Sequence, residues 1–270
     1  MRPQLLLVPQ GGLCNRLRTL LSALAVSRQM GGGSIRVEWA DRQPECSAGF
    51  HELFQPLDTD HLHITPRHWW NIPDERKNLH LPGLLRHCLY SRQVANFHPD
   101  RQGDIHHYLR TGQTLYISTC FPLCDYPPEL GRQLRLLPSL QQQVDRRTAH
   151  FADNTIGIHI RRTDNSVSIK KSPEQAFAKA IEREIEANTN IRFYLASDDE
   201  ALKRRFLRRY GFHIQTDFGT SSRSTLEGMQ EAAIQLWSLA RTRRLLGSYW
   251  SSFSDMAAEI GGIPLHIVQQ

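Results

Sequence analysis

Apolar residues recur with two different periods along the chain, and together they predict an α/β fold. Leu5–Val8 is a short apolar run typical of a buried strand, and the leucines from Leu17 to Leu24 repeat at helical spacing. The glycines at 31–33 then end the helix, and residues 35–39 (IRVEW) form the next predicted strand. A strand, a glycine turn, a helix and a strand make a βαβ unit, which implies a parallel sheet.

The same rhythm returns after residue 155. Strands are predicted at 155–160, 191–197, 212–217, 243–248 and 264–268, with helices between them. Ser172 is the expected N-cap of one helix with Pro173 at its first position, and Ser224 with Glu227 fits a capping box. Residues 42–138 are less regular, and 114–121 (TLYISTCF) is their clearest strand. We therefore predict an N-terminal α/β domain at 1–150 and a C-terminal Rossmann-like domain at 151–270.

Composition narrows the class of protein. The 270 residues are 40% hydrophobic and 22% charged, as in soluble globular proteins. No apolar run approaches the roughly 18 residues that span a bilayer, and the N-terminal apolar run is too short for a signal peptide. A cytoplasmic protein is expected, with attachment at a membrane surface left open.

The net charge of +6 comes almost wholly from arginine. A guanidinium binds phosphate or carboxylate through two parallel hydrogen bonds, so the arginines favour an anionic partner, with a merely basic surface as the equal alternative. The basic residues are dispersed and not gathered into one tract with aromatics, so nucleic acid is not the expected partner. The five cysteines and the histidines lack the spacing of a zinc site, and no metal is predicted.

Three segments place polar residues where predicted strands end. They are Gly11–Arg16, Arg161–Asp164 and Ser248–Ser254. Ligands of open α/β sheets bind at these carboxyl ends, where helix N-termini offer free N–H groups.

The most informative segment is 156–165 (IGIHIRRTDN). Guanidiniums at the end of its strand can neutralise a leaving phosphate, and Asp164 can orient one of them. A surface cluster of ion pairs is the alternative. His159 alternates with the isoleucines, so the pattern fits equally a histidine that faces a ligand and a buried, hydrogen-bonded one.

The other two segments are weaker by themselves. Ser251, Ser252 and Ser254 could form an anion cradle or simply cap a helix. The turn GGLCNR lacks the dinucleotide-binding and P-loop patterns, and its Asn15 and Arg16 could cap the helix or reach a ligand. In ASDDE, the two aspartates precede a helix, where capping explains them better than metal binding does.

Taken in order, these motifs resemble a known family. GGLCNRL, IGIHIRRTD, FYLASDD and LLGSYWSSFSDMAAE are similar to segments of the α1,6-/α1,2-/protein-O-fucosyltransferase superfamily, which includes the rhizobial nodulation fucosyltransferase. The resemblance covers residues 155–262 well and the first 40 weakly. It implies a GT-B-like fold, in which two Rossmann-like domains face each other across a cleft, with the acceptor on the side of the N-terminal domain and the donor nucleotide held mainly by the C-terminal one. It also implies an inverting enzyme that needs no metal. The implied donor is a GDP-sugar, with GDP-fucose expected, and the implied acceptor is a hydroxyl of a glycan or related molecule.

The resemblance also implies roles for individual residues. Arg161 would hold the β-phosphate of the donor and stabilise the departing GDP, supported by Asp164. The implied donor-binding residues are Asn15, Arg16, His159, Arg162, Glu231, Ser251, Ser252, Phe253 and Ser254. Glu231 is the candidate for reading guanine, with Gln235 one turn further along the same helix.

The chain also departs from the family. Cys14 stands where the turn usually has glycine, and NSVSIKKS after RRTD contains no carboxylate where the α1,6 enzymes carry a proposed base. A non-catalytic binder of a nucleotide or anionic glycan with the same fold is therefore the alternative to a glycosyltransferase. The acceptor, the linkage, the base and the oligomeric state do not follow from the sequence.

Overall fold

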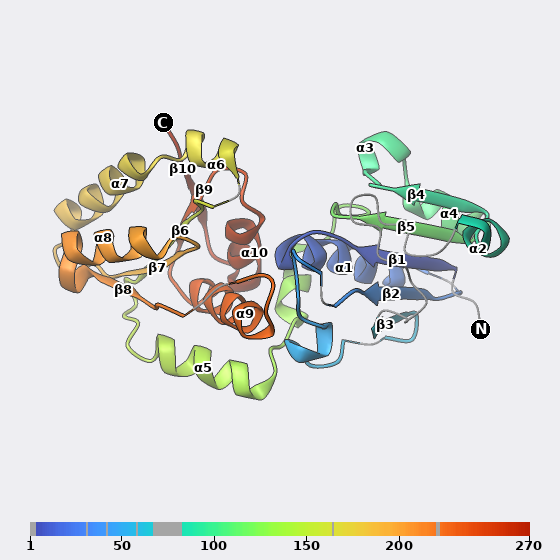
Figure 1. The fold of residues 1–270 in the computed structure, drawn as a ribbon, viewed down its shortest axis with the longest axis horizontal. Coiled ribbons are helices and arrows are strands. Elements are labelled where there is room, and N and C mark those ends of the chain that lie inside the picture. Colours follow the sequence, from blue (N-terminus) through green and yellow to red (C-terminus); the bar gives the residue numbers. More distant parts are fainter. Residues whose placement is uncertain are drawn as a thin grey trace. The chain divides into compact units, whose positions relative to one another are not determined.

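The structure, a computed structural model, describes the whole chain except residues 1–3, 31, 42, 58, 67–82, 164 and 220–221. The chain divides into two compact units. Unit 1 consists of Met1–Arg135 and Arg223–Met229, and unit 2 of Leu136–Ser222 and Gln230–Gln270. Each unit is built around its own parallel sheet of five strands (Figure 1).

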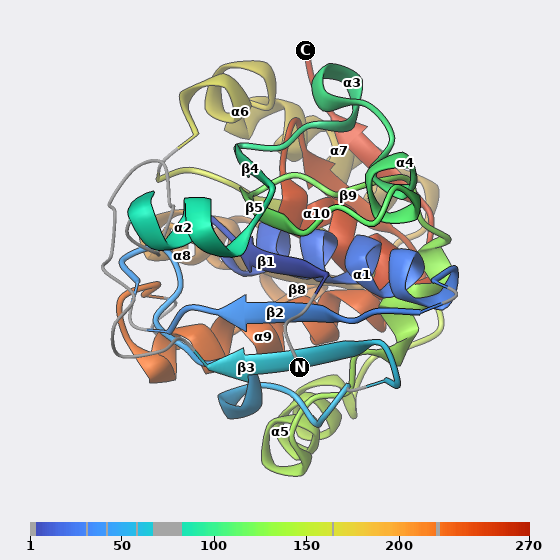
Figure 2. The same cartoon turned by 90° about the vertical axis from the view of Figure 1, so that its right-hand side faces the viewer.

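The sheet of unit 1 has the strand order β3-β2-β1-β5-β4. Its strands are β1 (Leu5–Pro9), β2 (Ile35–Trp39), β3 (Leu62–Pro66), β4 (Arg92–Ala95) and β5 (Leu115–Thr119). The helices are α1 (Leu13–Arg28), α2 (Gly83–Leu89), α3 (Pro99–Gln102) and α4 (Ile105–Arg110), with short 3₁₀ turns η1 (Phe50–Glu52) and η2 (Pro128–Gln133). Figure 2 shows β1, β2 and β3 lying side by side. All five residues of β1 are buried, as expected for a central parallel strand.

The sheet of unit 2 has the order β10-β9-β6-β7-β8. Its strands are β6 (Ile156–Ile160), β7 (Phe193–Ser197), β8 (Ile214–Thr216), β9 (Leu245–Ser248) and β10 (Leu265–Val268). The helices are α5 (Pro138–Thr148), α6 (Ser166–Lys171), α7 (Glu174–Ala187), α8 (Glu200–Tyr210), α9 (Leu226–Ala240) and α10 (Ser252–Gly261), with the 3₁₀ turn η3 (Gly211–His213). The first residues of α9 belong to unit 1.

Alternation along β6 decides which side chains meet which helices. Ile156, Ile158 and Ile160 join an apolar cluster that includes residues of α7 and α8. The intervening residues face the other side of the sheet. A Cβ on Gly157 would lie 2.7 Å from Thr242 Oγ1, just after α9, and His159 contacts Ser254 of α10. The histidine is therefore part of the packing between the sheet and α10.

The predicted α/β fold with two parallel, Rossmann-like sheets is confirmed. The sequence missed α6, and its predicted cap at Ser172 is wrong. Ser172 ends α6, and its hydroxyl donates to Val268 O at 2.5 Å, while α7 begins at Glu174 after Pro173. Within the described part of the chain, none of the helices combines the length and the apolar character needed to cross a bilayer.

Candidate functional site

The strand order of unit 2 locates the candidate site. Read from β6, the chain places β7 and β8 on one side and then β9 and β10 on the other. The direction of winding therefore reverses between β6 and β9. In open parallel sheets, such a switch point leaves a crevice at the carboxyl ends of the two strands. Arg161 follows β6 at this edge, and Ser248–Ser254 follow the end of β9.

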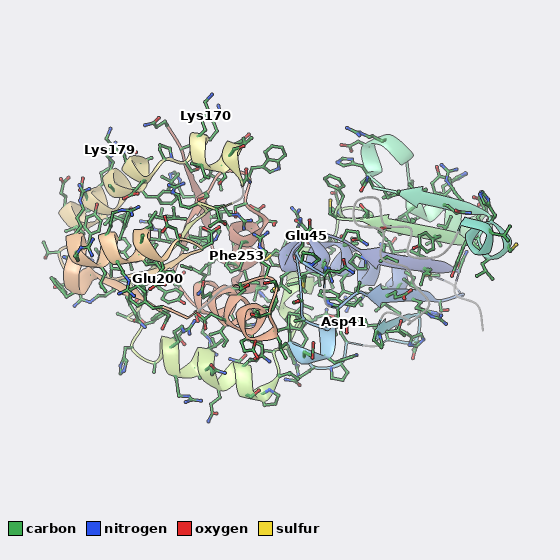
Figure 3. All side chains as sticks on the ribbon, viewed as in Figure 1. Asp41, Glu45, Lys170, Lys179, Glu200 and Phe253 are labelled. Carbon is green, nitrogen blue, oxygen red and sulfur yellow. The ribbon has the colours of Figure 1, made fainter. Side chains whose placement is uncertain are left out.

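His159 connects β6 to the first turn of α10. Its ring is buried, and its Nδ1 lies 2.8 Å from Ser254 Oγ and 3.5 Å from Ser251 Oγ. The ring of Phe253, a residue labelled in Figure 3, stacks on the imidazole at a centroid distance of 4.6 Å. Of the sequence-predicted residues, the structure brings these four together around the N-terminus of α10.

A glycine on the neighbouring strand makes this arrangement possible. His159 pairs in register with Gly247 of β9. A Cβ on Gly247 would lie 2.7 Å from the Cβ of Ser254, closer than real Cβ atoms approach. The missing side chain therefore lets α10 come close enough for Ser254 to reach the imidazole.

Burial also sets the protonation of this histidine. Loss of hydration lowers the pKa of His159 well below its usual value, and the nearby Arg161 acts in the same direction against the opposing effect of Asp198. The imidazole is consequently neutral at pH 7. It acts as a hydrogen-bonding group and carries no positive charge for a phosphate.

Arg161 supplies the charge at this edge. Its backbone N–H donates to Ser248 Oγ at 3.0 Å, and that hydroxyl donates to His159 O at 3.2 Å. Its side chain is 18% exposed, with Nε at 3.7 Å from Asp198 Oδ2. The guanidinium is thus held beside a carboxylate yet reaches the surface at the end of β6.

Asp198 is a site residue that the sequence analysis missed. Its carboxylate accepts from the N–H of Arg162 at 2.7 Å, and from the N–H and hydroxyl of Thr163 at 3.2 and 2.6 Å. It thereby ties the loop after β6 to the end of β7. Its neighbour Asp199 caps α8 by accepting from Leu202 N at 3.0 Å, as predicted for that position. The two adjacent aspartates have different roles.

Arg162, a predicted donor-binding residue, is used within the loop. Its Nη1 donates to Arg161 O at 2.9 Å and its Nη2 to Ser172 O at 2.9 Å. Burial lowers its pKa from the ordinary value. Asp164, the other predicted catalytic residue, lies outside the described residues.

The first turn of α10 offers backbone groups to a ligand. Ser251 is its N-cap residue, with extended backbone, and among the described residues its hydroxyl makes no capping hydrogen bond to the helix. Ser252 and Phe253 are partly exposed, whereas Ser251 and Ser254 are buried. The N–H groups at the start of a helix carry partial positive charge, and they favour an anion.

The predicted residues of unit 1 have a different environment. Arg16 is 1% exposed, and its guanidinium donates to Gly11 O at 2.8 Å and to Ala40 O. Burial lowers its pKa, and its charge lies over the ring of Trp39. Asn15 accepts from Arg18 Nη2 at 2.7 Å. Arg16 therefore holds the turn after β1 to the end of β2, a use of this side chain that the sequence analysis did not anticipate.

Glu231, the candidate for reading guanine, belongs to a network of charges in unit 2. Its two oxygens accept from Arg147 at 2.9 and 3.0 Å, and Oε1 also accepts from Gln235 Nε2 at 2.8 Å. Arg147 also lies 3.0 Å from Asp217, and both Arg147 and Glu231 are 13% exposed. The structure thus pairs the two sequence candidates with each other, and it adds Arg147 to them.

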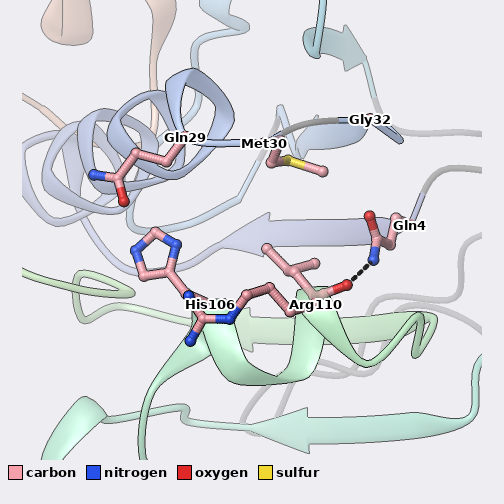
Figure 4. A pocket seen from close by; sticks show the side chains of 7 residues that line it. Gln4, Gln29, Met30, Gly32, His106 and Arg110 are labelled. Carbon is pink, nitrogen blue, oxygen red and sulfur yellow. Dashed lines mark hydrogen bonds between the residues drawn. The ribbon is translucent and has the colours of Figure 1, made fainter.

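A pocket of about 270 Å³ in unit 1 lies away from these groups (Figure 4). It is lined by Gln4, Gln29, Met30, Gly32, His106, Leu109 and Arg110. Gln4 precedes β1, so this pocket is at the amino end of the central strand, opposite the edge where ligands of parallel sheets bind. Among the described residues, no group of three or more His, Cys, Asp or Glu side chains could hold a metal ion.

Comparisons with known proteins bear on the fold. No protein-family model matches the sequence, and no curated protein matches it. Solved structures do match over nearly the whole length. The NodZ α-1,6-fucosyltransferase soaked with GDP-fucose is 16% identical, with 96% of this chain and 93% of that chain covered and a TM-score of 0.62. POFUT1 in complex with GDP is 12% identical, with 96% of each chain covered and a TM-score of 0.57.

The fucosyltransferase NodZ from Bradyrhizobium gives a similar result, at 14% identity and a TM-score of 0.57, with 95% of this chain and 92% of that chain covered. NodZ is a fucosyltransferase, the activity of the superfamily that the sequence motifs resemble. At such low identity the likeness establishes the fold: this chain has the GT-B-like architecture of the fucosyltransferases NodZ and POFUT1.

Proposed function

We propose that the protein is a glycosyltransferase that moves fucose from GDP-fucose to a hydroxyl group of a glycan or related acceptor. The observation that carries the proposal is the switch point of unit 2, where Arg161 and the first turn of α10 stand at the ends of β6 and β9. The fold supports the same donor, since structures of NodZ and POFUT1 with that fold were obtained with GDP-fucose or GDP.

The donor diphosphate would bind between the two strand ends. The N–H groups of the first turn of α10 and the hydroxyls near them would donate hydrogen bonds to its oxygens, and the Arg161 guanidinium would face the β-phosphate. Neutral His159 would keep Ser251 and Ser254 in place from below. Phe253, stacked on that imidazole, would form one side of the diphosphate site.

The chemistry would be a single displacement with inversion at the anomeric carbon. The acceptor oxygen forms a bond to that carbon as the bond to the β-phosphate oxygen breaks. GDP leaves with the bonding electrons, and the proton of the acceptor hydroxyl is released to water. Negative charge grows on the diphosphate during this step, and a guanidinium fixed beforehand stabilises it. We propose that no metal ion takes part, so chelators should leave turnover unchanged.

Glu231 and Gln235 remain our candidates for reading guanine. Their mutual hydrogen bond and the pair with Arg147 would fix the orientation of both side chains. A carboxylate has room for more than the contacts it makes here, because each oxygen accepts along two lone pairs.

Two measurements test the proposal. GDP should raise the thermal midpoint of the protein well above the effect of UDP or ADP, and the purified enzyme should release GDP from GDP-fucose when a panel of oligosaccharides is present. An equal response to all three nucleotides would contradict the guanine donor. Binding of GDP without turnover of GDP-fucose on any acceptor would favour the non-catalytic binder instead.

A further inference from the structure

One residue next to the proposed diphosphate site has a conformation that its side chain disfavours. Among the described non-glycine residues, two have a positive φ, and they are Asn96 and Trp250. Asparagine tolerates the left-handed region, whereas a bulky aromatic residue is an outlier there. Trp250 has φ +51° and stands between the end of β9 and the first turn of α10.

The same residue exposes its ring. The Trp250 side chain is 72% exposed, and the neighbouring Tyr249 is 37% exposed. A large apolar ring on the surface that also carries backbone strain is doubly unfavourable for an isolated chain. Backbone strain of this kind clusters at active sites and ligand-binding segments, where the surrounding structure holds it, and an exposed apolar ring there is available to a ligand.

Side chains at the two ends of α6 hold the strained turn. Ser172 Oγ accepts from Tyr249 N at 2.7 Å, and Asn165 Nδ2 donates to Trp250 O at 3.1 Å. Asn165 is itself fixed, since its Oδ1 accepts from Ser168 N at the start of α6. The loop after β6, which carries Arg161, and the turn after β9 are thereby joined. The indole is consequently presented at a defined place beside the switch point.

We propose that Trp250 is the platform on which the acceptor sugar stacks, an inference that rests on the proposed function. The acceptor hydroxyl has to come within bonding distance of the carbon attached to the β-phosphate, so its sugar must lie next to the diphosphate site. Trp250 directly precedes Ser251 of that site. A neutral acceptor lacks charges for the guanidinium to attract, and an indole offers a flat apolar surface together with one N–H donor for a hydroxyl.

The donor is a less suitable occupant. Its diphosphate is recognised by charge and by backbone N–H groups at Arg161 and α10, and its base by a polar network elsewhere in unit 2. Neither recognition element needs an exposed indole. We therefore assign Trp250 to the acceptor.

The test is a titration followed by ¹⁹F NMR on the full chain labelled with 5-fluorotryptophan. The chain has five tryptophans, and the Trp250 signal is the one missing from the spectrum of Trp250→Phe. Lactose, cellobiose and N,N′-diacetylchitobiose are added in turn, first without and then with saturating GDP. We expect at least one of these sugars to shift the Trp250 signal in a saturable way and to leave the other four signals in place.

Variants separate binding from folding. Trp250→Gly removes both the indole and the backbone strain, so its thermal midpoint should equal or exceed that of the wild type. Its affinity for the responding sugar, measured by calorimetry, should nevertheless fall about tenfold or more, the loss of one aromatic stacking contact. The matched control is Phe212→Ala, which also removes an exposed ring; Phe212 is 67% exposed. It lies in η3 at the amino end of β8, the edge strand on the far side of β6 from β9. The sugar affinity of this variant should equal that of the wild type.

Three outcomes would overturn the inference. If the Trp250 signal responds to none of the sugars, Trp250 does not bind the acceptor sugar. A shift caused by GDP alone, with loss of the sugar response, would assign the indole to the donor. A fall in the thermal midpoint of Trp250→Gly without change in sugar affinity would show a purely structural ring. Because the first titration uses neither GDP nor turnover, failure of GDP to bind would contradict the proposed function without altering this result.

Discussion

The two units have the same kind of sheet but use the ends of their central strands differently. In each unit, an arginine follows a buried parallel strand: Arg16 lies in the first turn of α1 after β1, and Arg161 lies in the loop after β6. The guanidinium of Arg16 is 1% exposed and bonded to two carbonyl groups. The side chain of Arg161 is 18% exposed beside Asp198, at the edge where α10 begins.

This difference shows that the position of a residue in the fold does not determine its role. Both arginines follow the carboxyl end of a strand, where Rossmann-like sheets bind ligands. Arg16 lies on α1, a helix packed into the core, so its guanidinium donates hydrogen bonds to carbonyl groups that follow β1 and β2. Arg161 lies in the loop between β6 and α6, which Asp198 holds by hydrogen bonds, and its side chain can face outward. We therefore expect anion binding in unit 2.

The largest effect is expected for Arg161→Ala. Turnover of GDP-fucose should fall by about 10²–10³-fold, the usual cost of removing one group that stabilises charge in a transition state. The thermal midpoint without ligand should change little, because the side chain makes a partly exposed ion pair. GDP release under saturating donor measures the effect.

Arg192→Ala is the matched control for this substitution. Arg192 directly precedes β7, so it lies at the amino edge of the same sheet, where its guanidinium covers the ring of Phe212. Its turnover should match the wild type. Equal losses in the two variants would mean that overall positive charge, and not the position of Arg161 at the end of β6, supports activity.

Arg16→Met tests the other half of the comparison. The buried carbonyl group of Ala40 and the part-buried one of Gly11 lose their donor, and the free energy of unfolding should fall by about 2–4 kcal/mol in urea titrations. The folded protein should still bind GDP with nearly wild-type affinity in calorimetry. A specific loss of GDP affinity at unchanged stability would assign Arg16 to the donor, as the family resemblance implied.

Asp198→Asn examines how the loop after β6 is fastened. The exchange removes the charge that faces Arg161 and one of the acceptors for Arg162 and Thr163. We expect about a tenfold loss in turnover, since charge-assisted hydrogen bonds are worth roughly 1.5–3 kcal/mol each and asparagine keeps part of them. Asp199→Asn, at the adjacent cap of α8, should leave turnover unchanged. Similar kinetics in both variants would contradict a special role for Asp198.

The smallest effect concerns pH and His159. Its pKa is lowered in the folded protein, so below about pH 6.5 the unfolded chain takes up a proton that the folded chain excludes. Stability should consequently fall with pH from about 6.5 downward, by up to about 1.4 kcal/mol per unit from this residue. His159→Gln should lose that part of the slope in unfolding experiments between pH 7 and 5.5. An unchanged slope would mean that the imidazole is charged or exposed.

Local patterns in the sequence were sufficient for the frame of unit 2. Apolar alternation and terminal breaks located β6, β7 and β9, because each of these strands is buried on both faces and ends abruptly in polar residues. The same alternation allowed either role for His159. What decides between them is Gly247, a residue paired with it across the sheet, and no local pattern reveals such a pair.

Contacts between distant segments explain the remaining errors. Asp198 fastens a loop 35 residues away, so its sequence neighbourhood indicated only a helix cap. Helical periodicity marks the buried face of α1 through its leucines, but it does not show that the guanidinium of Arg16 is buried with them. Ser172 was expected to cap a helix because Pro173 follows it, whereas its hydroxyl bonds the last strand. In each case the decisive partner is remote in sequence.

The central claim is that unit 2, at the switch point between β6 and β9, binds the diphosphate of the donor. The most direct measurement is a crystal structure of the protein grown with GDP. We predict phosphate oxygens within hydrogen-bonding distance of the Arg161 guanidinium and of the backbone N–H groups at Ser251–Ser254. A diphosphate bound at the Gly11–Arg16 segment of unit 1, with Arg161 making no contact to it, would contradict this claim.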